Sequence, residues 1–315
     1  MRTSENVLFC CSHKFDLRTT NKQTSTKTTN KKTSFFAIMT IFNKAAIVTL
    51  TFMSTATTFS YAGKSKKGNS DFCVDDGEGA ITLVSASSET PEGLKPSFDA
   101  FTTLLGGPNN GNLATSNPDG GHRRVNWDAP ATSKPFLPFD MPFDFFAQTV
   151  TRGLLLESKN NEFRVCTDGE TDVLCDSLNE EASNEFQAFS GGRIFLPAGG
   201  ENEFLISFTD PNPESGLPAT VEGFGAVFVN VDKEFHTKMT FFAESGCIIA
   251  EEFVKVAPGG LSFLGVISGE GIPDIFEIEV TLGKKAIDET DKAKGVTAMD
   301  DFLYSEPNTG NNILG

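Results

Sequence analysis

The segment GGHRRVNWD, residues 120–128, brings together a histidine, two arginines and the sole tryptophan of the chain. Guanidinium groups donate paired hydrogen bonds to carboxylates and hydroxyls, and an indole ring can stack on the apolar face of a sugar. The segment therefore supplies four candidate ligand-binding residues, which are His122, Arg123, Arg124 and Trp127. The alternative is a structural role, with the tryptophan in the core and the arginines paired with acidic residues.

Clusters of acidic residues suggest a second chemistry, the binding of a structural Ca²⁺. Hard cations are held by several oxygen ligands, mainly carboxylates and backbone carbonyls. We expect these clusters to lie beside the first, central and last strands, and their members are Asp75, Asp76, Glu78, Asp232, Asp300 and Asp301. Neighbouring strand residues point to opposite faces, so at most one of Asp300 and Asp301 should face inward. The alternative is that these are turn and surface acids.

Motifs for catalysis are missing from the sequence. It contains no GxSxG, no HExxH and no P-loop, and GFG at 223–225 lacks the third glycine of a nucleotide loop. Glycoside hydrolysis needs only a pair of carboxylates, and a protein this acidic can hold many such pairs. The sequence singles out none of them.

Charge and composition exclude several classes of protein. The 315 residues include 26 Lys plus Arg against 42 Asp plus Glu, a formal charge of −16. Phosphate binding needs a basic face, so nucleic acid is not an expected partner. With 38% hydrophobic and 22% charged residues, the chain fits neither a disordered acidic tail nor a multi-span membrane protein.

The N-terminal region has the features of an export signal. Residues 39–62 combine Lys44, a short apolar stretch and Ser60-Tyr61-Ala62, which fits a secretory cleavage site. The apolar stretch is too short to span a membrane, so we expect no membrane insertion after cleavage. Residues 1–38, rich in Thr, Lys and Asn, are expected to be an upstream extension of the gene model or disordered; a long n-region is the alternative. We therefore predict a secreted or periplasmic protein.

The remaining chain is expected to hold one domain. Residues 63–72 form a linker, residues 73–307 the domain and residues 308–315 a tail. Without residues 1–62 the chain has 18 basic and 40 acidic residues, which favours cations and disfavours anionic polymers.

Four cysteines in the exported part are consistent with an oxidising compartment. They allow three pairings. Cys166 and Cys175 flank a short polar loop and are the natural local pair, which leaves Cys73 with Cys247. A zinc site is the alternative, but there is no CxxC and only two histidines follow the signal.

Short apolar segments with two-residue periodicity predict an antiparallel sheet with one wet face. The clearest is 275–282, in which apolar and polar residues alternate. The expected strands are 80–87, 203–209, 220–232, 237–243, 247–256, 261–267, 275–282 and 296–304. One short helix is expected over 96–105, near the start of the domain. We therefore predict an all-β fold, an antiparallel jelly-roll-like β-sandwich.

A stretch rich in proline and phenylalanine, 129–146, is expected to be an irregular loop across a sheet edge. Within it, FLPFDMPFDFF at 136–146 could form an exposed interaction surface. We favour burial, because five exposed phenylalanines would promote aggregation.

Several segments, in this order, resemble a group of exported bacterial proteins of unknown function that are predicted to be β-sandwiches. They are GGHRRVNWD (120–128), LPFDMPFDFF followed by TRG (137–153), ATVEGFGAVFVNVD (219–232), LSFLGV (261–266) and VTAMDDFLYSEP (296–307). The resemblance implies an exported sandwich and carries no catalytic residues. The acidic pair before Phe302 is also similar to jelly-roll carbohydrate-binding and adhesion modules.

These observations predict an exported, non-catalytic binding or structural module whose partner is an extracellular carbohydrate or matrix component, with Ca²⁺ as the expected cofactor. The alternative is a secreted polysaccharide hydrolase or lyase that uses carboxylates on a concave sheet.

Overall fold

The structure is a computed structural model of the whole chain. It describes residues 57–61 (backbone only), 72–73, 81–128, 140–167, 186–270, 274–287 and 294–310. All of these belong to one compact unit, Phe52–Gly315.

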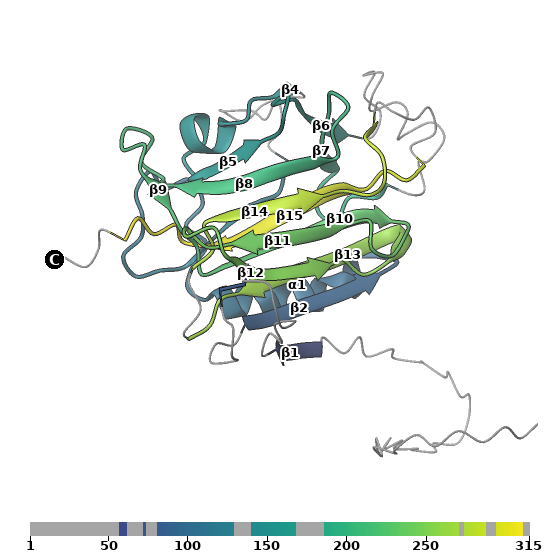
Figure 1. Cartoon of the computed structure of the whole chain (residues 1–315), viewed down its shortest axis with the longest axis horizontal. Coiled ribbons are helices and arrows are strands. Elements are labelled where there is room, and N and C mark those ends of the chain that lie inside the picture. Colours follow the sequence, from purple (N-terminus) through teal and green to yellow (C-terminus); the bar gives the residue numbers. More distant parts are fainter. Residues whose placement is uncertain are drawn as a thin grey trace, which may run out of the picture. The chain divides into compact units, whose positions relative to one another are not determined.

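Two antiparallel sheets form the fold, as the strand pattern predicted (Figure 1). The larger, sheet A, has the order β1-β2-β13-β10-β15-β7-β6-β4, with β3 also paired to β15. Its strands are β1 (Thr57–Tyr61), β2 (Ile81–Ser88), β3 (His122–Val125), β4 (Asp140–Met141), β6 (Phe163–Thr167), β7 (Arg193–Pro197), β10 (Gly223–Val231), β13 (Ala257–Ile267) and β15 (Ala298–Ser305).

The smaller sheet, sheet B, has the order β12-β11-β14-β8-β5, with β9 also paired to β8. Its strands are β5 (Leu154–Glu157), β8 (Glu203–Thr209), β9 (Pro218–Ala219), β11 (Lys238–Phe242), β12 (Ile248–Phe253) and β14 (Glu277–Thr281). The all-β sandwich is thus confirmed.

A phenylalanine-rich core fills the space between the sheets. Phe204, Phe208, Phe224 and Phe302 are all buried in it. On sheet B the opposite face is wet, because Glu277 and Glu279 alternate with buried Ile278 and Val280. Every residue of β10 and β15 is buried instead, so the central strands of sheet A are covered on both faces.

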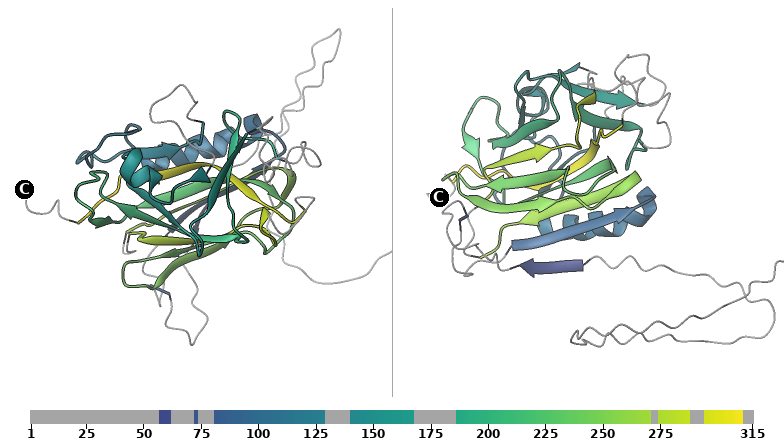
Figure 2. Two further views of the ribbon diagram at one scale, coloured as in Figure 1. Left: turned by 90° about the horizontal axis from the view of Figure 1, so that it is seen from above. Right: turned by 45° about the vertical axis from the view of Figure 1, so that its right-hand side comes forward.

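The cover on the outer face of sheet A is helix α1 (Pro91–Leu105), which lies over β2 and β13 (Figure 2). It begins five residues before the predicted start, because Thr90 caps it by accepting a hydrogen bond from the N–H of Gly93 and Pro91 occupies its first position. Phe101 of α1 packs directly on the backbone of β13. A Cβ at Gly265 would lie 2.5 Å from its ring, so glycine is required there.

The proline- and phenylalanine-rich stretch is more regular than predicted. Residues 129–139 lie outside the described part, but β4 and a single π-helical turn, η1 (Phe145–Thr149), follow. Phe145 and Phe146 are buried and Phe143 is exposed. The expectation of a wholly irregular loop was therefore wrong for its C-terminal part.

One predicted disulfide, Cys73–Cys247, is present and joins two residues that lie 174 positions apart in the sequence. It holds Phe72 beside Ile248 at the start of β12, so it ties the beginning of the domain to an edge of sheet B. Cys166 is also disulfide-bonded, whereas its expected partner Cys175 lies outside the described residues.

Candidate functional site

The four candidate residues of the 120–128 segment are divided between the two faces of sheet A. β3 is extended and pairs with the end of β15, so side chains alternate along it. His122 lies near α1, with Nδ1 3.1 Å from the carbonyl oxygen of Gly106. Trp127 faces the core, where its ring stacks on Phe195 at 4.2 Å. The four side chains do not converge on one ligand.

Arg123 is fully buried and has every donor engaged. Its Nε and Nη2 atoms donate to the two carboxylate oxygens of Glu306, at 2.9 and 2.6 Å. The other Nη hydrogens reach backbone carbonyls of Gly111, Leu113, Thr115 and Thr151. Arg123 therefore offers no N–H to an external ligand and instead fixes Glu306 and the loop around it.

Arg124 points to the outer face, where it donates to both carboxylate oxygens of Asp301 at 3.2 and 2.5 Å. Its guanidinium carbon lies 5.1 Å from the centre of the Phe98 ring of α1. The side chain is about one-third exposed, whereas that of Asp301 is fully buried.

A β-bulge places Asp300 and Asp301 on the same face. In the pairing of β10 with β15, Ala226 is opposite Phe302 and Phe228 is opposite Met299. Two residues of β15 therefore face one residue of β10, and the alternation of side chains is interrupted. Both aspartates are fully buried, and both contact Ser190. The expectation that these neighbouring residues point to opposite faces was therefore wrong: both side chains lie on the outer face of sheet A beside Arg124 and Phe189, and neither faces the core between the sheets.

The carboxyl group of Asp300 is only half satisfied. Its Oδ2 accepts hydrogen bonds from the backbone N–H groups of Phe189 and Ser190, at 2.6 and 3.2 Å, while Oδ1 has no partner. Burial, followed by the nearby charge of Asp301, raises the pKa of Asp300 well above its ordinary value. Burial also raises the pKa of Asp301 and of Asp128, whose carboxylate holds the backbone of Gly192.

The predicted metal ligands are not brought together in the described part of the chain. Asp75, Asp76 and Glu78 lie outside it. Asp232 directly follows the last residue of β10, two positions after Asn230, whose side-chain amide donates to the carbonyl oxygen of Val296. Asp300 and Asp301 bond to protein groups as described above. Within the described ranges, no set of three or more His, Cys, Asp or Glu side chains is arranged to hold a metal ion.

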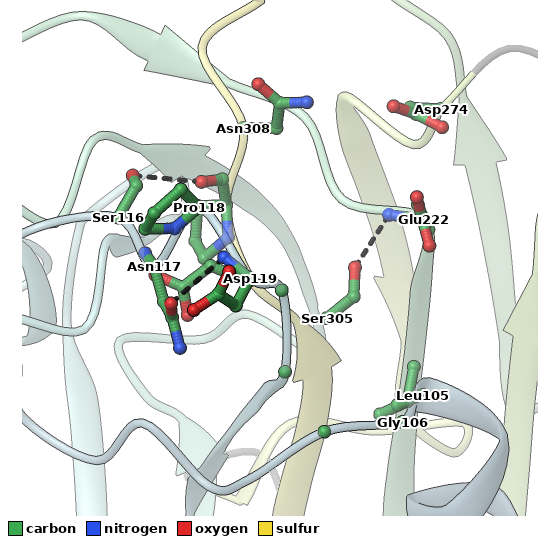
Figure 3. Close-up of a pocket in the computed structure, with 15 residues that line it drawn as sticks. Leu105, Gly106, Ser116, Asn117, Pro118, Asp119, Glu222, Asp274, Ser305 and Asn308 are labelled. Carbon is green, nitrogen blue, oxygen red and sulfur yellow. Dashed lines mark hydrogen bonds between the residues drawn. The ribbon is translucent and has the colours of Figure 1, made fainter. Parts of the chain in front are cut away.

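A polar pocket of about 380 Å³ opens at one end of the sandwich (Figure 3). Asn117 and Asp119 lie on one side of it, and Glu222 and Asp274 lie on the other. Its lining residues are Leu105, Gly106, Gly107, Ser116, Asn117, Pro118, Asp119, Gly120, Gly121, Glu222, Asp274, Ser305, Glu306, Pro307 and Asn308. None of these fifteen residues is basic, and Arg123 neutralises only Glu306.

The wall of this pocket is built by the loop that follows α1. Asn110 donates to the carbonyl of Gly120 and to Glu306, and Asn117 donates to Asn110. On the far side, the Ser305 hydroxyl accepts N–H bonds from Glu222 and Gly223, so its own proton can be donated to a ligand. The sequence signal for this loop was its run of Gly, Asn, Pro and Asp, GGPNNGNLATSNPDGG at 106–121, which predicts turns but not a pocket.

The exposed face of sheet B holds a second set of carboxylates. Glu279 pairs with Leu205, which pairs with Glu157 on the next strand, and Glu277 lies two residues before Glu279. Burial, followed by the charges of Glu157 and Glu279, raises the pKa of Glu277.

Comparison of the chain with protein-family models, with curated proteins and with solved structures finds no match. Among the helices described here, none is long and apolar enough to cross a membrane.

Proposed function

We propose that this protein is an exported, non-catalytic β-sandwich module that binds a carbohydrate in the pocket beside Glu222 and Asp119. The observation that carries the proposal is the composition of the pocket wall. Carboxylates, amides and hydroxyls line it without any basic residue. Such a wall disfavours anionic ligands and offers many partners to the hydroxyl groups of a neutral sugar.

Preorganisation of the wall supports this function. Glu306 is held by two bonds from Arg123 and one from Asn110, so one side of the pocket does not need to reorder on binding. Asp119 and Glu222 are exposed on opposite sides, and their carboxylates have no bond to another described side chain. These two carboxylates are free to accept hydrogen bonds from sugar hydroxyls.

The test is a glycan array followed by calorimetry with the best soluble oligosaccharide. We expect Glu222→Ala and Asp119→Ala each to weaken binding at least about tenfold, the loss of roughly one charge-assisted hydrogen bond. Glu92→Ala is the matched control, because Glu92 is an exposed glutamate in the first turn of α1, whereas Leu105 and Gly106 at the opposite end of that helix line the pocket. Equal binding by all three variants, or binding of no glycan, would refute the proposal.

Calcium and export are tested with the same protein. If Ca²⁺ is structural, chelation lowers the melting temperature by several degrees; an unchanged midpoint ends that expectation. Mass spectrometry of the exported protein should find Gly63 as its first residue. Cleavage there would remove β1, which pairs with β2, and leave β2 as the edge of sheet A.

The second candidate function is polysaccharide hydrolysis on sheet B. It is favoured by the raised pKa of Glu277 beside Glu157 and Glu279, because glycosidases pair a protonated carboxylic acid with an ionised carboxylate. Release of reducing sugar that is abolished by Glu277→Gln and retained by Glu222→Ala would establish this alternative.

A further inference from the structure

Two phenylalanines lie side by side in solvent at one end of sheet B. Phe235, in the turn between β10 and β11, is 70% exposed, and Phe253, the last residue of β12, is 40% exposed. Their ring centroids are 5.2 Å apart and the ring planes are almost perpendicular. Among the residues that the structure describes, Phe235 is the most exposed large hydrophobic side chain.

The backbone of Phe235 is held in an unfavourable conformation. Its φ is +63°, in the left-handed region, which is unfavourable for a bulky side chain and readily adopted by glycine. The ring stays in water, so burial in the core does not repay this cost. Strain that presents a side chain to solvent is a feature of ligand-binding positions.

Polar groups continue from these rings across the exposed face of sheet B. Phe253 pairs with Lys238, Lys238 with Thr281, and Thr281 with Glu203. Adjacent strands are about 4.8 Å apart, so this row offers donors and acceptors at regular intervals. Lys238 is also paired with Glu251 at 2.8 Å. An aromatic ring followed by such a row suits a ligand that has one apolar face and many hydroxyl groups.

We propose that Phe235 and Phe253 form a platform in which the more exposed Phe235 ring stacks on one pyranose ring of a polysaccharide chain and the perpendicular Phe253 ring supports it, while the hydroxyls of the chain bond to Lys238, Glu251 and the row beyond them. The platform and the pocket are different sites, because Glu222, which lines the pocket, directly precedes β10 and Phe235 follows the other end of that strand. The proposal rests on the proposed function only in taking a carbohydrate as the ligand.

The small size of the apolar area favours a sugar over a protein partner. A stable protein interface buries about 800 Å² on each side, and two partly exposed rings surrounded by charged residues cannot supply it. The neighbours in the turn are Lys233, Glu234 and His236. One ring face, in contrast, matches the apolar face of one pyranose, and aromatic residues at such sites contribute strongly to binding.

The experiment is affinity electrophoresis of the full-length exported protein in gels that contain hydroxyethylcellulose, xylan, laminarin or glycol chitin. We expect retardation in at least one gel and at least a tenfold weaker affinity in Phe235→Ala and Phe253→Ala. Phe235→Trp should retain the retardation, because a larger ring preserves stacking. Phe143→Ala is the matched control, since Phe143 is exposed to a similar extent as Phe253 but precedes η1.

Phe235→Gly separates binding from folding. Glycine relieves the left-handed strain, so we expect this variant to melt at the same or a higher temperature while its retardation is lost. Unchanged retardation of Phe235→Gly, or no retardation of the wild type in any gel, would overturn the platform. A change in sedimentation coefficient on Phe235→Ala without a change in retardation would show a contact between protein copies instead, and would also overturn it.

The two sites fail independently. Loss of binding in Glu222→Ala with binding retained in Phe235→Ala supports the pocket and overturns the platform, and the reverse pattern supports the platform and overturns the pocket. Loss of retardation in both variants supports both sites on one bound chain.

Discussion

Arg123 and Arg124 are neighbours on one short strand, yet they lie in opposite electrostatic environments. Arg123 faces one carboxylate, Glu306, and fills its remaining donors with backbone carbonyls. Arg124 faces Asp301, whose negative charge helps to raise the pKa of the neighbouring Asp300, and the charge of Asp128 raises the pKa of both aspartates. The first pair is electrically balanced. In the second group the pKa values of Asp128, Asp300 and Asp301 all stay raised, although Arg124 lies beside Asp301 and Arg193 beside Asp128.

The difference shows what each network does in the fold. A balanced, fully hydrogen-bonded buried pair stabilises one conformation of the surrounding loops. Here the pair Arg123–Glu306 shapes the wall of the pocket. An unbalanced set of buried carboxylates favours protonation, so its contribution to stability depends on pH. The four predictions below break or sharpen this contrast, from the largest expected effect to the smallest.

Removal of Arg123 should have the largest effect. Arg123→Ala leaves Glu306 nearly buried without its partner, and breaking such a pair costs about 3–5 kcal/mol. The free energy of unfolding, measured by urea denaturation, should fall by that amount. The double variant Arg123→Met with Glu306→Met should recover part of the loss; a loss below about 1 kcal/mol in the single variant would contradict the balanced network.

Removal of Arg124 should cost less and should depend on pH. Arg124 is partly exposed, so Arg124→Ala should lower the free energy of unfolding by about 2 kcal/mol at pH 7. Without its guanidinium partner, the pKa of Asp301 rises further. The loss should therefore shrink towards pH 4, where Asp301 binds a proton. A loss that is constant between pH 4 and pH 8 would show that Arg124 acts through packing on Phe98 alone.

Neutralising Asp300 should stabilise the protein. The folded state keeps the proton on Asp300 above the ordinary pKa of 3.8, at which the unfolded chain releases it. The wild type therefore loses stability as pH rises from about 4 to the raised pKa of the folded state. Asp300→Asn removes this loss, so we expect a higher free energy of unfolding at pH 7 and a flatter dependence on pH. Lower stability than the wild type at pH 7 would show that Asp300 functions as an anion.

Breaking the exposed ion pair Lys95–Asp99 on α1 should have the smallest effect on stability of the four changes. Both side chains are more than half exposed, at a distance of 2.6 Å, and exposed helical pairs contribute about 0.3–0.5 kcal/mol. Lys95→Ala should change the melting temperature by no more than about a degree or two. A loss comparable to that of Arg124→Ala would contradict the role of burial in the contrast above.

Much of the fold was predictable because it follows from periodicity. The alternation at 275–282 identifies β14 and its wet face, and the apolar runs at 220–232 and 296–304 identify the central strands β10 and β15. The start of α1 was missed although Thr90 followed by Pro91 is a helix-start signal. The cover on the outer face of sheet A was missed because a strand buried on both faces depends on which distant segments pack over it.

The candidate site was less predictable than the fold. Glu306 is 183 residues from Arg123, and no local pattern links them. The bulge depends on the register between β10 and β15, which single-strand alternation cannot show. The exposed platform consists of Phe235 in a turn and Phe253 at the end of a later strand, and their contact cannot be read from either segment alone.

By itself, the sequence determined the fold class and the presence of a short helix, since these depend on side-chain types at short spacing. It reduced the four cysteines to three possible pairings, and the structure showed that Cys73 pairs with Cys247. Only the tertiary structure decided that His122, Arg123, Arg124 and Trp127 separate, that Asp300 and Asp301 share a face, and that a pocket opens beside Glu222. The physical reason is that contacts, burial and strand register arise between segments far apart in the chain. These relations set the charge balance and exposure of each group.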